Sequence, residues 1–170
     1  MDPEKDAGLM IGRFQPFHKG HLRIVKRIIE ERGFAKIAVG SAQYSHTAEN
    51  PFSFEEREGM IRAALEEDGV EGSRYHIYCV PDIHNYPRWV AHVEGIVGDY
   101  GAVYTANPVN VRLFREKGRE VVVHELHDGI SATKIRELMA EGKKSWKEMV
   151  PDAVAERIER LDVRKRLNAG

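Results

Sequence analysis

A loop rich in histidine, glycine and arginine lies between the first apolar segment and the first amphipathic segment of the chain, at residues 12–21. His18 and His21 are three residues apart, so both imidazoles can lie on one side of the helix that begins here. Gly12 and Gly20 permit a close approach of the backbone, and free amides at a helix start favour a bound phosphate. Two imidazole donors at this place suit a phosphate chain whose charge grows during a reaction.

Other sites built on the same histidines are weaker alternatives. The metalloprotease pattern needs histidines four residues apart with an adjacent glutamate, which this loop lacks. His124 and His127 could complete a four-histidine site with His18 and His21, but acidic and cysteine ligands are missing. A P-loop is excluded, because the Gly-Lys-Lys-Ser fragment at residues 142–145 follows a helical segment and has no earlier glycine. We therefore expect no structural metal.

Apolar segments alternate with amphipathic segments along the chain. Apolar segments predict strands at residues 8–12, 36–39, 75–80, 102–105 and 120–124. Amphipathic segments and capping residues predict helices after Gly20, from Ser53 to about Gly69, from Pro87, from Pro108, after Ser131 and over residues 152–167. This alternation predicts an α/β fold, a parallel sheet with helices on both faces.

The loops that follow the strands are the expected ligand site, because ligands bind beyond the carboxyl ends of parallel strands. A length of 170 residues favours a single domain, residues 1–170, with residues 151–170 as a C-terminal helical extension. The net charge of −1 gives no long-range field for nucleic acid or an anionic membrane. We therefore expect small-molecule ligands, and neither nucleic acid nor membrane as a partner.

Cys79 is the only cysteine, so an intramolecular disulfide is excluded. Its apolar surroundings predict a buried structural thiol. The charged N-terminus does not have the apolar centre of a signal peptide, and no segment approaches the ~20 apolar residues that span a bilayer. These features predict a soluble, cytoplasmic protein.

The histidine loop matches the H-x-G-H signature of the nucleotidyltransferase superfamily, and residues 12–21 in full resemble the archaeal-type nicotinamide mononucleotide (NMN) adenylyltransferases. Segments in the same order as in that family are residues 40–43, 45–47, 50–52, 56–57, 89–90 and 107–108. Residues 130–136 resemble the second signature, which closes over ATP. Two departures are Ala132, where glycine is usual, and Asn85, which lies one place earlier than the family's asparagine.

The resemblance implies a Rossmann-like nucleotidyltransferase fold and a direct reaction. The phosphate of NMN attacks the α-phosphorus of ATP, pyrophosphate leaves, and NAD forms. The implied catalytic residues are His18, His21 and Arg136. The implied ATP- and phosphate-binding residues are Gly12, Arg13, Phe14, Gly20, Arg57, Ser131 and Thr133, and the implied NMN-binding residues are Ser41, Asn85, Trp89 and Asn107. Mg²⁺ is implied as a partner of the ATP phosphates, with few protein ligands, and so is a homo-oligomer such as a hexamer.

Several of these roles have structural alternatives. Arg57 could form an ion pair on a helix surface, Arg136 could be solvated, and Trp89 could belong to the core. Ser131 and Thr133 could act as helix caps, a role compatible with phosphate binding.

The function has alternatives as well. The same scaffold adenylylates or cytidylylates phosphopantetheine, FMN or glycerol phosphate in other enzymes, and a non-catalytic nucleotide sensor would keep the pocket. A metal hydrolase would use the four histidines, and stoichiometric zinc in purified protein would identify it.

Overall fold

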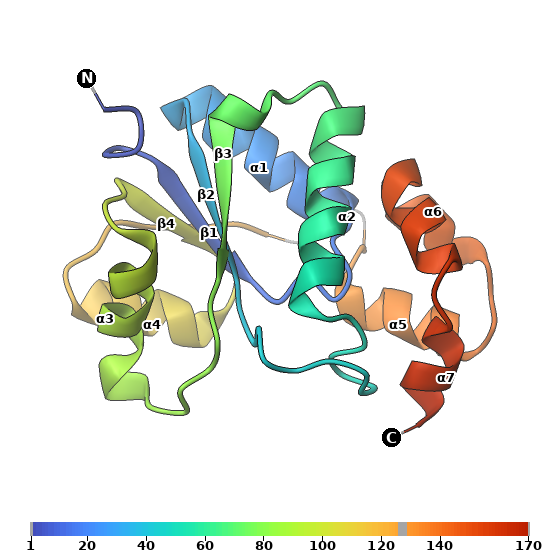
Figure 1. The fold of residues 1–170 in the computed structure, drawn as a ribbon. Coiled ribbons are helices and arrows are strands. Elements are labelled where there is room, and N and C mark those ends of the chain that lie inside the picture. Colours follow the sequence, from blue (N-terminus) through green and yellow to red (C-terminus); the bar gives the residue numbers. More distant parts are fainter. Residues whose placement is uncertain (1, 126–128, 170) are drawn as a thin grey trace.

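The computed structural model of the protein describes residues 2–125 and 129–169. Its strands are β1 (Gly8–Gly12), β2 (Ala35–Val39), β3 (Tyr75–Cys79), β4 (Ala102–Thr105) and β5 (Val121–Val123). They pair in parallel in one sheet with the order β3-β2-β1-β4-β5 (Figure 1). The predicted parallel α/β fold is confirmed, and each strand ends within one residue of its predicted limits.

The helices follow the strands as predicted. They are α1 (Lys19–Arg32), α2 (Phe54–Glu67), α3 (Tyr86–Val97), α4 (Pro108–Glu116), α5 (Ala132–Ala140), α6 (Asp152–Glu159) and α7 (Val163–Asn168), with short 3₁₀ helices η1 (Gly72–Arg74) and η2 (Ser145–Met149). Side-chain caps start α1 to α5. At α2, Ser53 Oγ accepts from Glu56 N at 3.1 Å, and Glu56 Oε1 accepts from Ser53 N at 2.9 Å. This reciprocal pair satisfies two amides that a helix start would leave free.

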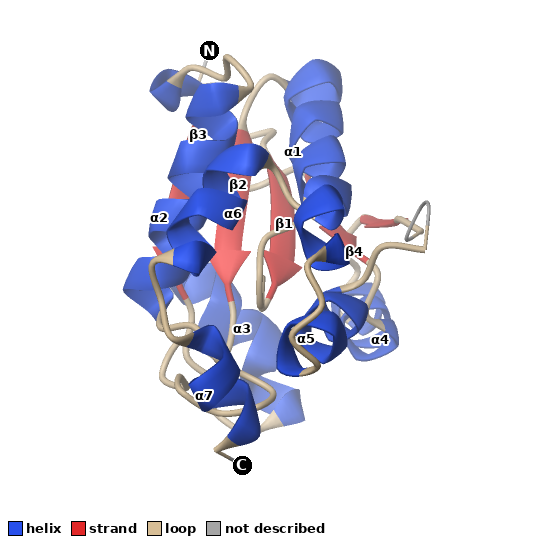
Figure 2. Cartoon of the chain, turned by 90° about the vertical axis from the view of Figure 1, so that its right-hand side faces the viewer, coloured by secondary structure: helices blue, strands red, loops and turns tan. Residues whose placement is uncertain are grey.

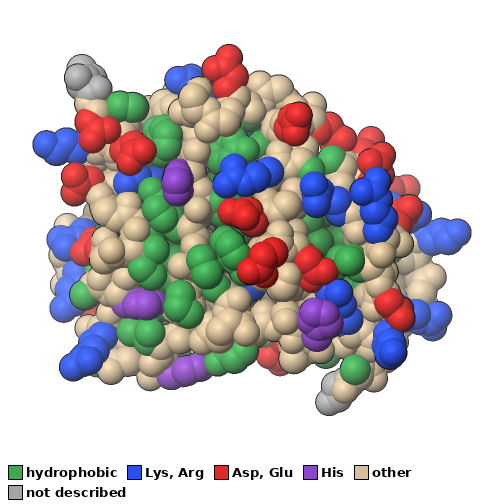
Figure 3. All heavy atoms as spheres, in the orientation of Figure 1, with side chains coloured by type: hydrophobic (Ala, Val, Ile, Leu, Met, Phe, Trp, Pro, Cys, Tyr) green, Lys and Arg blue, Asp and Glu red, His purple; other side chains and the backbone are tan. Residues whose placement is uncertain are grey.

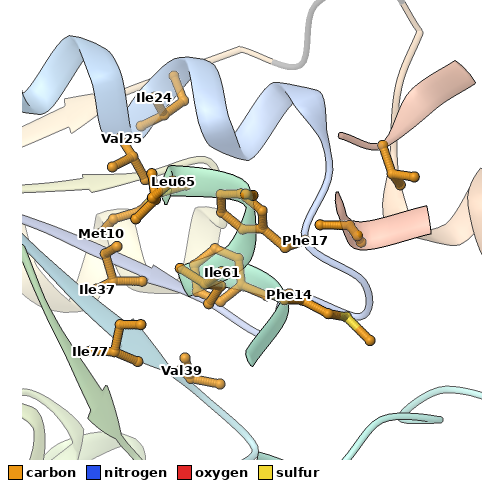
Figure 4. Close-up of a cluster of buried hydrophobic side chains, with 14 of the residues drawn as sticks. Met10, Phe14, Phe17, Ile24, Val25, Ile37, Val39, Ile61, Leu65 and Ile77 are labelled. Atoms are coloured by element: carbon orange, nitrogen blue, oxygen red, sulfur yellow. The ribbon is translucent and has the colours of Figure 1, made fainter. Parts of the chain in front are cut away.

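Alternate side chains of the central strand enter two separate cores, because successive residues of a strand point to opposite faces. Met10 packs with residues of α1 and α2, such as Val25 and Ile61 (Figure 4). Leu9 and Ile11 pack on the other face against α3 and α4. Figure 2 looks onto the side where α1, α2 and α6 cover the sheet. Helices therefore cover both faces, and the strand ends are left to carry the ligand loops.

The C-terminal segment is two helices, so the prediction of one continuous helix over residues 152–167 was wrong. The helix α6 ends at Glu159, and Asp162 has a non-helical ψ of 65° before α7 begins. The break lets α6 pack against α2 while α7 packs against α5. A straight helix could not bury both Ile158 and Leu167 against these different neighbours.

The thiol of Cys79 is exposed, so its predicted burial was also wrong. The strand β3 lies at the edge of the sheet, and Cys79 is its last residue. Its alternate residues Tyr75 and Ile77 are buried, whereas Cys79 at the carboxyl end of the strand is exposed. An apolar sequence does not distinguish the covered part of an edge strand from its uncovered end.

Acidic and basic side chains are intermingled over the face drawn in Figure 3, as the near-zero net charge leads one to expect. None of the helices within residues 2–125 and 129–169 has the length and hydropathy needed to cross a bilayer.

Candidate active site

Two adjoining hollows lie at the carboxyl ends of the strands. The larger, of about 380 Å³, is lined by the loops after β1, β2 and β3 and by the start of α4. The smaller, of about 120 Å³, is lined by His21, Thr105 and His124 among others. Gly12 and Asn107 line both hollows; Gly12 ends β1 and Asn107 follows β4, where the strand order reverses. Two ligands bound there would meet at the switch point of the sheet.

His18 and His21 form a reciprocal cap on α1. His18 precedes the helix, and its Nδ1 accepts hydrogen bonds from the backbone N–H groups of Gly20 at 3.0 Å and His21 at 3.3 Å. In return, His21 Nδ1 accepts from the backbone N–H of His18 at 3.1 Å. The rings stack with 3.6 Å between their centroids, so the predicted common orientation of the two imidazoles is confirmed.

The cap determines which ring atoms can donate. A nitrogen that accepts a backbone N–H carries no proton, so each neutral ring holds its proton on Nε2. Burial, and secondarily His124, lowers the pKa of His18 to about 4. Burial, followed by the two neighbouring histidines, also takes the pKa of His21 well below its ordinary value. Both rings are therefore neutral Nε2–H donors at physiological pH.

Most of the amides expected to be free at the start of α1 are occupied, two of them by the ring of His18. His18 Nδ1 takes the N–H groups of Gly20 and His21, and His18 O takes that of Leu22 at 3.0 Å. A phosphate would meet the Nε2–H groups, which the positive end of the helix polarises through the rings. Gly20 is required for this arrangement: a Cβ there would lie 2.8 Å from His18 Cε1.

Arg136 joins the two signature segments. Its Nη1 donates to Gln15 O at 2.8 Å, and its Nη2 lies 3.4 Å from Thr133 Oγ1. Ser131 caps α5, with Oγ accepting from Lys134 N at 3.1 Å. Burial is the main cause that lowers the pKa of Arg136, which remains a cation. The start of α5 thus lies beside the first loop, although 121 residues separate Arg136 from Gln15.

Two arginines expected to bind phosphate differ in exposure: Arg13, in the loop after β1, and Arg57, on α2. Arg13 is exposed, and its Nη1 lies 3.5 Å from Asn50 Oδ1. Phe14 is buried and packs edge-on against His21, with 4.8 Å between ring centroids. Arg57 is completely buried, so the alternative of a surface ion pair was wrong. Its guanidinium donates to backbone carbonyls, which leaves it badly placed as the expected phosphate ligand.

The larger hollow contains all four residues expected to bind NMN. Ser41 Oγ donates to Asp82 Oδ2 at 2.8 Å, and Trp89 Nε1 donates to Asn110 Oδ1 at 2.8 Å. Asn85 and Asn107 also line the hollow. Their side chains are occupied as the N-caps of α3 and α4, which places the two helix starts at its rim.

Comparison with known proteins bears directly on this arrangement. The model of the cytidylyltransferase-like family matches residues 9–138. The nicotinamide-nucleotide adenylyltransferase of Picrophilus torridus is 47% identical over 157 residues, 90% of each chain. That of Ignicoccus hospitalis is 47% identical over 161 residues, 94% of each chain. The chain belongs to the nicotinamide-nucleotide adenylyltransferase family.

The fold of this adenylyltransferase family member is also similar to that of a solved structure. It is a bifunctional NMN adenylyltransferase/ADP ribose pyrophosphatase from Francisella tularensis, in complex with AMP and a manganese ion. The two structures superpose with a TM-score of 0.78 at 24% identity. The match covers 97% of this chain and 52% of that one, so this chain corresponds to about half of that protein.

Three polar residues at the site of this adenylyltransferase family member were not among the site residues expected from the sequence. Asp82 lines the larger hollow and accepts from Ser41. Gln43 binds both backbone groups of Asp82 at 2.9 Å, and Asn110 holds the indole N–H of Trp89. The aspartate could have been suspected, because it lies in the loop after the third strand. Gln43 and Asn110 have partners 39 and 21 residues away, which no local pattern reveals.

The four-histidine metal site is not supported by the part of the chain that the structure describes. His127 lies outside the described residues. Within them, no group of three or more His, Cys, Asp or Glu side chains is arranged to hold a metal ion.

Proposed function

We propose that this protein transfers the adenylyl group of ATP to NMN, forming NAD and pyrophosphate. The observation that carries the proposal is the pair of hollows that share Gly12 and Asn107. His21 lines the smaller hollow, and Trp89 and Asp82 line the larger one. The triphosphate would bind on the histidine side and NMN on the tryptophan side, with their phosphates meeting at the switch point.

The reaction needs alignment and charge stabilisation more than covalent chemistry. An oxygen of the NMN phosphate attacks the α-phosphorus of ATP, the bond to the bridging oxygen of the β-phosphate breaks, and pyrophosphate takes its electrons. The Nε2–H groups of His18 and His21 donate to phosphate oxygens as their charge grows. Arg13 and Arg136 supply positive charge, and Arg136 is assigned to the departing pyrophosphate.

Mg²⁺ bound with ATP would supply charge neutralisation on the phosphates. Among residues 2–125 and 129–169, no cluster of three or more His, Cys, Asp or Glu side chains could hold such an ion. The phosphate oxygens would therefore provide most of its ligands. Arg13 and Arg136 would complement it from the protein side. We also propose a homo-oligomeric assembly such as a hexamer, which molar mass by light scattering would test.

A substrate panel tests the proposed reaction. ATP is supplied with NMN, nicotinate mononucleotide, phosphopantetheine, FMN or glycerol phosphate, and pyrophosphate release is measured for each. We expect rapid release with NMN. Turnover of phosphopantetheine or FMN without turnover of NMN would reject the assignment, and nucleotide binding without any turnover would indicate a sensor.

A further inference from the structure

The side chain of Arg57 is a buried cation held by backbone carbonyl groups. Its Nη1 donates to Arg13 O at 2.9 Å and to Gly40 O at 2.8 Å, and its Nη2 donates to Ser41 O at 3.2 Å. Its Nε donates to Ser53 O at 3.2 Å. Four of the five guanidinium N–H bonds are therefore used. Burial lowers its pKa to about 10, so it is still charged at neutral pH.

These carbonyls belong to two loops that form one wall of the larger hollow. Arg13 follows β1, and Gly40 and Ser41 follow β2; all three line the hollow. Arg57 comes from α2 and is fully buried, and it is not among the lining residues. The guanidinium thus joins the two loops from behind the wall.

Each loop contains a non-glycine residue in the left-handed region next to a carbonyl that Arg57 holds. Phe14 has φ of 53° and follows Arg13; Ser41 has φ of 48° and follows Gly40. Bulky L-residues rarely adopt this conformation, and it persists only where the surroundings impose it. Hydrogen bonds from one rigid guanidinium to both preceding carbonyls are such a constraint.

The same bonds set the direction of two amides. In a trans peptide the carbonyl of one residue and the N–H of the next point in opposite directions. Because Arg13 O and Gly40 O point at Arg57, the N–H groups of Phe14 and Ser41 point away from it. Within the described chain neither N–H donates to a protein acceptor. Two neighbouring amides left free in this way suit a bound anion.

We propose that Arg57 is a positioning residue that orients the Phe14 and Ser41 amides toward a phosphate oxygen at the reacting centre. The proposal rests on the proposed adenylyl transfer for the identity of that phosphate. The sequence led us to expect that Arg57 binds phosphate directly. In this proposal its guanidinium instead acts through the two peptide groups and does not touch the phosphate.

The first test is Arg57→Lys, which keeps the charge but cannot bind the carbonyls of both loops. Arg62→Met, on the same helix with an exposed side chain paired with Glu58, is the control. We expect kcat to fall about 10²-fold in Arg57→Lys, the scale for misplacing groups at a reacting centre by about 1 Å. The KM values for ATP and NMN should change much less, because the base contacts lie elsewhere. A purely structural Arg57 would lower the melting temperature and leave kcat of the folded enzyme within about twofold, which would overturn the proposal.

The second test is independent of turnover. AMP is titrated into ¹⁵N-labelled wild-type protein, and the amide signals of Phe14 and Ser41 are followed. We expect AMP to shift both amide signals in the wild type and in Arg62→Met. In Arg57→Lys we expect AMP to leave both signals unshifted. Unresponsive amides in the wild type would overturn the proposal even if Arg57→Lys does not fold. If the wild type makes no NAD but its two amides respond to AMP, the proposed function fails and the role of Arg57 stands.

Discussion

His18 and His21 each accept a hydrogen bond at Nδ1 from the other's backbone N–H. The distance is 3.1 Å from His18 N to His21 Nδ1 and 3.3 Å from His21 N to His18 Nδ1. The pair is a capping box built from imidazoles, in the place where serine and glutamate are usual. It stabilises the start of α1 and holds both rings in one tautomer, with the Nε2–H groups left to donate. Structure and proposed catalysis therefore depend on the same two hydrogen bonds.

The first prediction concerns stability and pH. His18 has a folded-state pKa of about 4, below the ordinary value of 6.5. Between these values the unfolded chain binds a proton that the folded protein does not, so stability is full above pH 6.5 and is lost as the pH falls toward 4. The loss from this residue is on the order of 3 kcal/mol. Urea unfolding of wild type and His18→Asn, which keeps a capping side chain, measures it. Parallel pH curves for the two proteins would contradict the prediction.

The second prediction concerns the phosphate donors. His21→Ala removes one Nε2–H, and Arg136→Ala removes a cation that lies beside Gln15 O. Because both groups act on developing charge, kcat should fall about 10²–10³-fold and ATP binding should weaken less. Lys134→Ala, an exposed change two residues before Arg136 on α5, should retain full activity. Near-normal turnover by His21→Ala would indicate a packing role.

The third prediction separates a ligand-binding tryptophan from a core tryptophan. Trp89 lines the larger hollow, whereas Trp146 is buried in the core with α6 and α7. Stacking of an indole on a pyridinium ring is worth about 1–3 kcal/mol, so Trp89→Ala should raise KM for NMN roughly 5- to 150-fold. KM for ATP should hardly change.

Trp146→Ala is the matched control for this change. We expect it to lower stability by about 3–5 kcal/mol and to leave KM for NMN unaltered in the folded enzyme. If Trp89→Ala behaved in the same way, Trp89 would be a core residue.

The fourth prediction concerns the C-terminal helix. Arg166 on α7 donates to Glu56 Oε1 at 2.7 Å, to Glu56 Oε2 at 3.1 Å and to Pro51 O at 3.0 Å. Burial alone would raise the pKa of Glu56, but bonds from Arg166 and Ser53 outweigh it and lower the pKa. Arg166→Gln should cost roughly 1–3 kcal/mol of stability at neutral pH.

The contribution of Glu56 has a defined pH dependence. Because its folded-state pKa is lowered, its stabilisation is present above the ordinary value of 4.5 and is lost as the pH falls through the folded value. The wild type and Arg166→Gln should therefore converge in stability at acid pH. A double-mutant cycle with Glu56→Gln at neutral pH should give a coupling energy, and a coupling of zero would exclude the ion pair as the cause.

Sequence alone predicted the strands, the helix caps Ser53 and Ser131, and the loops that surround the two hollows. These features depend on local patterns: hydrophobic period, capping residues and the spacing of His18 and His21. The loops at the ends of β1, β2, β3 and β4 could be placed together because parallel strands bring their carboxyl ends to one edge. Even the histidine cap is local, since its two members are three residues apart.

Tertiary structure alone decided the role of Arg57, the exposure of Cys79 and the break after Glu159. The carbonyls that bind Arg57 from the two strand-end loops lie 16, 17 and 44 residues away, so its local sequence shows only an arginine on a helix. Cys79 is exposed at the carboxyl end of the edge strand β3, and the chain breaks after Glu159 because α6 and α7 pack on different helices. Burial and long-range hydrogen bonds are properties of the packed chain, and no window of sequence contains the partners that set them.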